Sequence, residues 1–184
     1  MLPGRRHRIL GGVLDPRFLR RGAVPDPGPR GRPPPLLRLA ARGRDVRRRG
    51  YRLLPHTADL RIEVVGEDMP RLYASCATAL FSLLTDRRRV RETWKKTVRV
   101  EGSSPEDRLF FLLRAALLLF EVDRFLVRRA HVRMEGNQVT MSASGEPADF
   151  TRHTFGREIK AVTRHLLTVE KRPGGFVARF VVDV

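Results

Sequence analysis

The sequence has one cysteine, few aromatic residues and no long apolar run, and each shortage excludes a class of protein. Cys76 has no second cysteine to bond with, so an intrachain disulfide is excluded and a reducing compartment is expected. The longest apolar stretch, residues 109–120, contains Arg114 and is shorter than the roughly 18 residues typical of a membrane span. Aromatic residues make up only 7% of the chain, which weighs against a module that stacks RNA bases on aromatic rings.

Lysine is also scarce, because only four of the 37 basic residues are lysines. The net charge of +17 is unevenly placed: the first 50 residues hold 14 arginines against three aspartates, a net of +11, which leaves +6 for residues 51–184. A strongly basic chain can bind nucleic acid. An arginine-rich, solvated tail from a GC-rich genome produces the same numbers, and the uneven placement favours that interpretation.

The first 50 residues form a segment of their own. They contain eight of the 13 prolines and eight of the 15 glycines, and they show neither helical nor strand periodicity. Such a composition buries too little apolar surface to offset the entropy of ordering the chain. A transit peptide would be rich in serine, and this segment has none. We therefore expect a basic, disordered tail over residues 1–50 and a folded domain over residues 51–184.

Hydrophobic periodicity in the second segment predicts an α+β domain, with two helices and a mainly antiparallel sheet. Asp68 can cap a helix that ends near Thr85-Asp86, and the arginines at 87–89 are expected in the loop after it. Ser104 and Pro105 start a second helix, which is apolar almost all round and should lie in the core. The expected strands cover residues 60–64, 97–100, 125–134, 139–144, 158–169 and 176–182.

Two aspartates stand at expected strand ends and are candidate metal ligands. Asp59 leads the first of these strands, where a carboxylate has to be solvated, paired or bound to a cation. Asp183 follows the last strand, and Val184 adds a terminal carboxylate. If these two strands pair antiparallel, the three carboxylates meet at one end of the sheet, as oxygen ligands suited to calcium, magnesium or manganese. Solvation at a turn or at a terminus explains each aspartate separately, so both interpretations stay open.

Two further residues are candidates because of their position. Lys160 interrupts the apolar strand expected over 158–169, where a lysine either faces solvent at a sheet edge or lies beside phosphates or the carboxylates. His56 stands three residues before Asp59.

These residues resemble the motifs of the archease family. His56-Thr57-Ala58-Asp59 matches the HTAD signature of that family, and a glycine at 66 and a capped helix follow as expected. Its later pattern matches Gly145-Glu146, His153, Gly156, Glu158 and residues 160–163, and a penultimate aspartate closes the chain. Thr154 and Arg164 depart from the pattern, which has proline and tyrosine there.

The resemblance implies an archease-like fold and a function without catalysis. Archeases activate the GTP-dependent RtcB-type RNA-splicing ligase by stimulating its guanylylation and multiple turnover, in tRNA splicing or RNA repair. The expected protein is thus cytoplasmic, has no membrane partner, and meets RNA and GTP through the ligase. Asp59, Asp183 and Val184 would hold one divalent cation, calcium in the family with manganese or magnesium as alternatives, and Lys160 and His56 would lie nearby.

Two other functions remain open from the residues themselves. A metal-dependent hydrolase could use Asp59, Asp183 and His56 to activate water, although the five histidines show no clustered ligand spacing. A basic RNA-binding module could use the arginines, although no aromatic RNA-recognition signature is present.

Overall fold

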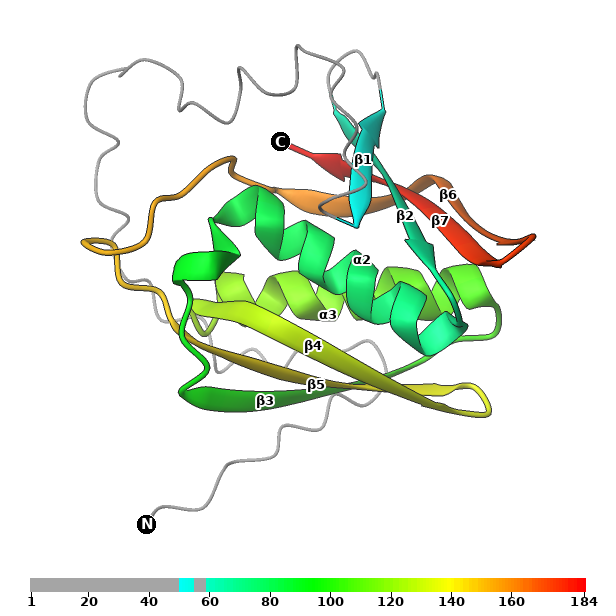
Figure 1. Ribbon diagram of the computed structural model, residues 1–184, viewed down its shortest axis with the longest axis horizontal. Coiled ribbons are helices and arrows are strands. Elements are labelled where there is room, and N and C mark those ends of the chain that lie inside the picture. Colours follow the sequence, from blue (N-terminus) through cyan, green and yellow to red (C-terminus); the bar gives the residue numbers. More distant parts are fainter. Residues whose placement is uncertain (1–49, 55–58) are drawn as a thin grey trace, which may run out of the picture.

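The computed structural model describes residues 50–54 and 59–184, which form two antiparallel sheets with two helices between them (Figure 1). The four-stranded sheet has the order β1-β2-β7-β6, and the three-stranded sheet has the order β3-β5-β4. In chain order the strands are β1 (Tyr51–Leu54), β2 (Leu60–Gly66), β3 (Trp94–Glu101), β4 (Phe125–Glu135), β5 (Gln138–Pro147), β6 (Ala161–Arg172) and β7 (Gly175–Asp183).

Side-chain caps start both helices where the sequence predicts them. Helix α2 (Met69–Leu84) begins after Asp68, whose carboxylate accepts a hydrogen bond of 2.7 Å from the amide of Arg71. Helix α3 (Pro105–Glu121) begins after Ser104, whose hydroxyl accepts from the amide of Asp107 at 3.0 Å. The caps satisfy amides that the first helical turn leaves without a partner.

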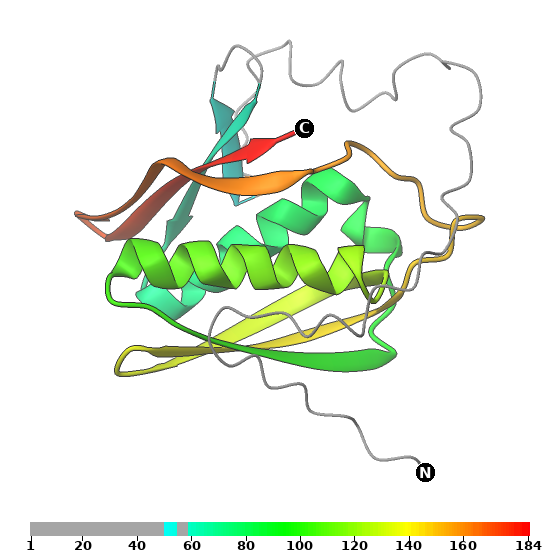
Figure 2. The ribbon, with the colours of Figure 1, turned by 180° about the vertical axis from the view of Figure 1, so that it is seen from behind.

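The helices form the middle layer of the domain. Seen from opposite sides, α2 and α3 lie between the two sheets (Figures 1 and 2). Helix α2 packs against β2 and β4, and α3 packs against β3 and β6, so each helix contacts both sheets. This arrangement buries most of the apolar surface of both helices, and Leu72, Phe81, Leu109 and Leu113 have no exposed surface. None of the described helices is long and apolar enough to cross a membrane.

The expected α+β class and both helices are confirmed, and the structure adds three features. A short strand, β1, precedes β2 and pairs with it antiparallel. Strand β6 begins at Ala161 and not at residue 158, because Ala161 pairs with Asp183, the last residue of its partner strand β7. Residues 87–89 form a 3-10 helix, η3 (Arg87–Arg89), and not an irregular loop, because the carboxylate of Asp86 accepts from the amide of Arg88 at 3.1 Å and caps it. Apart from Gly50, the predicted tail of residues 1–50 lies outside the described residues.

A β-bulge interrupts the pairing of β4 with β5. Val127 pairs with Gly145 and Arg129 pairs with Ser144, so Arg128 is an extra residue in β4. Gly145 permits this arrangement, since a Cβ atom there would overlap the main-chain oxygen of Leu126. A glycine inside a strand commonly marks such a close approach of two backbones.

The substitution Gly145→Ala should therefore destabilise the domain by about 3 kcal/mol or more, because backbone and not a flexible side chain would have to move. Gly136→Ala is the matched control: Gly136 lies in a turn with φ of 56°, and nothing lies within 4 Å of its added Cβ. It should cost about 1 kcal/mol, the strain of a left-handed alanine. Urea unfolding of both variants measures the difference, and equal losses would contradict the role given to Gly145.

Candidate functional site

The antiparallel pairing of β2 with β7 brings the two candidate aspartates to one end of the four-stranded sheet. Leu60 pairs with Val182, so the next position of the register places Asp59 opposite Asp183. The strand pairing on which the sequence prediction depended is thus confirmed. Both aspartates are partly exposed, and Asp59 takes part in further polar interactions.

Lys160 lies at the same end of the sheet, next to the end of β7. Its amide donates to the main-chain oxygen of Asp183 at 2.9 Å, and its ammonium group donates to the main-chain oxygen of Val184 at 3.1 Å. We call Asp59, Asp183, Val184 and Lys160 the sheet-end cluster. His56, the remaining candidate, lies outside the described residues.

Asp59, Asp183 and Val184 offer oxygen atoms, which suit a hard divalent cation. Within the described part of the chain, no three His, Cys, Asp or Glu side chains are grouped so that they could hold a metal ion. A cation here would therefore need main-chain oxygen from Val184 in addition to the two aspartates. Because Lys160 already contacts that oxygen, its ammonium group would compete with the cation.

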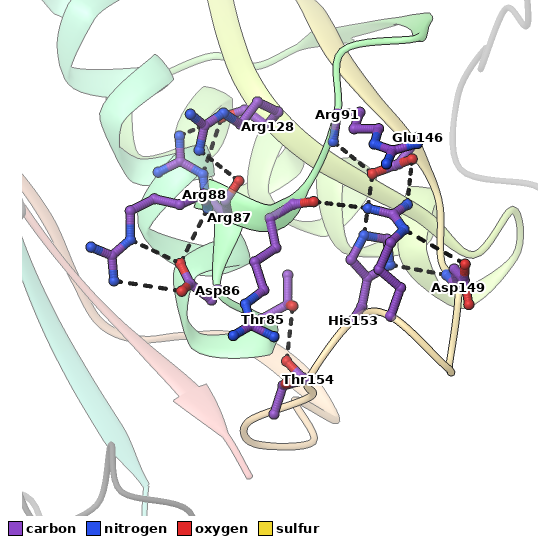
Figure 3. Close-up of polar contacts among 12 residues, drawn as sticks. Thr85, Asp86, Arg87, Arg88, Arg91, Arg128, Glu146, Asp149, His153 and Thr154 are labelled. Atoms are coloured by element: carbon purple, nitrogen blue, oxygen red, sulfur yellow. Dashed lines mark hydrogen bonds and ion pairs between the residues drawn. The ribbon is translucent and has the colours of Figure 1, made fainter.

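A second polar group, which lies around buried Glu146 and His153, was not recognised as a network from the sequence (Figure 3). The amide of Asp149 donates to Nδ1 of His153 at 2.9 Å, so Nδ1 is the acceptor. The hydrogen of the neutral ring then lies on Nε2, which donates to Oε1 of Glu146 at 3.2 Å. One amide thus selects both the tautomer and the direction of the histidine ring.

Arg152 and Arg91 complete the contacts of the Glu146 carboxylate. Arg152 Nη2 lies 2.6 Å from Oε2, and the amide of Arg91 donates to Oε1 at 2.6 Å. Burial alone would raise the pKa of Glu146, but the Arg152 ion pair, the Arg91 amide and His153 outweigh it and hold that pKa below its ordinary value. Glu146 therefore carries its charge at neutral pH.

This network fixes one end of the segment that leads to Lys160, and helix α2 fixes its middle. The hydroxyl of Thr85 donates to the main-chain oxygen of Thr154 at 2.9 Å, and the amide of Gly156 donates to the main-chain oxygen of Leu84 at 2.8 Å. The partner at residue 154 is a main-chain atom, so threonine serves there as well as the proline of the family pattern. The other departure, Arg164, lies over the ring of Phe110 at 4.3 Å.

The fold and the sheet-end cluster together define a small α+β domain whose four-stranded sheet ends in two carboxylates and a lysine. The model of the archease protein family (MTH1598/TM1083) matches residues 51–184, and the chain belongs to this family.

Similar proteins agree with this assignment. The chain is 34% identical over 139 residues to the protein archease of Methanosarcina mazei, covering 73% of this chain and 95% of that protein. It is 35% identical over 135 residues to that of Methanopyrus kandleri, covering 71% and 96%.

Two solved structures share the fold. The solution structure of protein 1598 of Methanobacterium thermoautotrophicum has a TM-score of 0.62 at 24% identity and covers 74% of this chain and 99% of that one. The crystal structure of an archease, possible chaperone, from Thermotoga maritima has a TM-score of 0.51 at 22% identity and covers 71% and 94%.

Glu146→Gln tests the buried network. The variant should lose about 2 kcal/mol of stability at pH 7, because it removes the charge that Arg152 and the Arg91 amide contact. Since the folded-state pKa of Glu146 is lowered, its contribution is present above the unfolded pKa of about 4.3 and is lost as pH falls below it. The difference in melting temperature between wild type and variant should therefore be constant from about pH 8 to pH 5 and should shrink below about pH 4.

Glu92→Gln is the control, because Glu92 pairs with Arg129 at 2.9 Å on the exposed surface. It should cost less than about 0.5 kcal/mol. A pH-independent difference for Glu146→Gln would show that the charge of Glu146 does not stabilise the fold.

Proposed function

We propose that this protein activates a GTP-dependent RtcB-type RNA ligase by stimulating ligase guanylylation and multiple turnover, and that it catalyses no reaction alone. The observation that carries the proposal is the sheet-end cluster in a chain of the archease family: strand register gathers carboxylates and a lysine at one exposed end of the domain. Charged groups placed in this way can act on phosphates at the active site of another protein.

The residues of the cluster would divide two tasks. Lys160 is exposed, and its main chain is anchored to β7, so its ammonium group can reach phosphate oxygens while its backbone stays in place. Asp59, Asp183 and the Val184 carboxylate would hold a divalent cation, calcium before manganese or magnesium. His56, three residues before Asp59 in the sequence, stays a candidate for the same task. When bound, such a cation neutralises phosphate charge and orients the groups for in-line transfer.

The chemistry of the single cysteine supports a role without catalysis. Cys76 is fully buried on α2, and burial raises the pKa of its thiol far above the ordinary range, so a nucleophilic thiolate is strongly disfavoured. The proposed activator therefore supplies charge and position, and the ligase supplies the nucleophile.

The test is transfer of labelled GTP to the cognate ligase over several turnovers. Wild-type protein should accelerate the transfer, and Asp59→Ala should abolish the stimulation with little change in melting temperature, because a strand-end acid contributes little to the core. Lys160→Ala should weaken stimulation by about tenfold, the value of one charge-assisted hydrogen bond. Asp123→Ala is the control, since Asp123 pairs with Lys96 of β3 in the other sheet and should leave stimulation unchanged.

An unchanged ligase rate with wild-type protein in calcium, magnesium and manganese would contradict the proposal. RNA binding without an effect on the ligase would then favour an RNA-binding module. Hydrolysis of RNA or nucleotide by the protein alone would favour a metal-dependent hydrolase.

Calcium titration calorimetry tests the cation site separately. The protein, first freed of metal with a chelator, should bind one calcium ion per chain, and Asp183→Asn should weaken binding by at least about tenfold because it removes a charged ligand. Lys160→Ala should strengthen binding, since the ammonium group that contacts the Val184 oxygen no longer competes. Asp123→Asn should leave the affinity unchanged, and equal affinities for wild type and Asp183→Asn would exclude this site.

A further inference from the structure

Two arginines from distant parts of the chain, Arg87 of η3 and Arg128 of β4, lie against each other (Figure 3). Arg128 Nη1 donates to the main-chain oxygen of Arg87 at 2.6 Å. Arg87 in turn donates from Nε at 3.2 Å, and from Nη2, to the main-chain oxygen of Arg128. Each arginine therefore holds the backbone of the other, and the two guanidinium groups are fixed as a pair.

The backbone of both segments is shaped to make this arginine pair. Arg128 is the extra residue of the β4 bulge, so its carbonyl oxygen is free of the ladder and can accept from Arg87. The turn of η3 holds the carbonyl of Arg87 in place for Arg128, because the amide of Val90 also donates to that oxygen at 3.1 Å. Ser82 adds a third anchor, because its hydroxyl accepts from Arg87 Nη1 at 3.2 Å.

Within the described part of the chain, neither guanidinium group of the pair has a carboxylate partner. The nearest acids in sequence are already used: Asp86 binds Arg88 at 3.1 Å, and Glu92 binds Arg129 at 2.9 Å. The hydrogen bonds to the two main-chain oxygens hold like charges side by side. Burial and then the charge of Arg128 lower the pKa of Arg87, in keeping with that placement. An anion between or beside the two groups would relieve that repulsion.

The pair also keeps donors available. A guanidinium group has five N–H donors, and the contacts above use three of Arg87 and one of Arg128. Six donors are left over from these contacts, and both residues are only partly buried, so the pair is open to a ligand from solvent. Their planar, forked arrangement matches the oxygens of a phosphate group.

We propose that the Arg87–Arg128 pair is a phosphate-binding site and that its ligand is the backbone of single-stranded RNA. A chain of phosphates fits the surroundings better than a single phosphate ion. Arg88 is paired with Asp86, but Arg89 and Arg91 also follow Arg87 closely and are exposed, so further positive charge lies close to the pair along the chain. The proposal concerns the protein alone and does not rest on any ligase partner.

The first measurement follows the Arg87 Nε–H signal by NMR during titration of the full-length protein with inorganic phosphate. This hydrogen is bonded to the Arg128 oxygen, so it reports directly on the pair. Phosphate should shift the signal in a saturable manner, and sodium chloride at equal ionic strength should not. A signal that moves equally in both titrations, or in neither, would overturn the site.

The second measurement uses fluorescence anisotropy with a labelled uridine RNA of about ten nucleotides, a site size typical of single-strand binding. Arg128→Gln should weaken binding by roughly tenfold and lower the salt dependence by about one released ion. Arg133→Gln is the matched control, because it removes the same charge from an exposed position of the same strand and leaves the basic residues 1–50 intact. It should change affinity less than about twofold.

The NMR titration and the anisotropy measurement together distinguish binding of free phosphate from binding of RNA. If phosphate shifts the Arg87 signal but both variants bind RNA equally, RNA is not the ligand and this part of the proposal fails. Arg128→Lys covers the case in which Arg128→Gln does not fold: it keeps the charge, loses the fork, and should bind RNA with intermediate affinity. Binding equal to wild type by Arg128→Lys would contradict a site that depends on the guanidinium geometry.

Discussion

The pairing of β2 with β7 organises this domain, because it joins a strand near the start of the described domain to the last strand of the chain in the middle of the four-stranded sheet. Its register places Asp59 opposite Asp183, and the neighbouring pairing of β6 with β7 adds Lys160. A slip of one residue would turn every side chain of β2 to the other face and expose buried Ile62 and Val64. The apolar core therefore sets the register, and the register in turn gathers the charged cluster.

A single glycine has a comparable effect on the other sheet. Gly145 lets β5 pass close to Leu126, and the resulting bulge releases the carbonyl of Arg128 from the ladder. The next residue, Glu146, anchors His153 and Arg152 and with them the segment that leads to Lys160. The Gly145-Glu146 motif thus positions groups of two charged regions, the arginine pair through the bulge and the sheet-end cluster through the segment that leads to Lys160.

The sheet-end cluster, the Glu146 network and the arginine pair differ in the sign of their charge and in how that charge is balanced. The sheet-end cluster combines carboxylates with one lysine, and Glu146 is matched by Arg152 and a main-chain amide. Among the residues that the structure describes, the hydrogen bonds of Arg87 and Arg128, in contrast, go to main-chain oxygens and a serine hydroxyl. The balanced network around Glu146 stabilises the fold, whereas the arginine pair, which has no carboxylate partner among the described residues, is suited to an external anion.

Local patterns in the sequence determined the two helices, most strands and the α+β class, since caps and periodicity act over a few residues. They also marked Asp59 and Asp183 as acids at strand ends, and antiparallel pairing was one of the options they left open. Only the tertiary structure decided that the strands divide into two sheets with the helices between them. The tertiary structure alone joined His153 to Glu146, because this contact depends on how the segment after β5 packs. It alone also joined Arg87 to Arg128, 41 positions apart, because that contact depends on a bulge that no local propensity encodes.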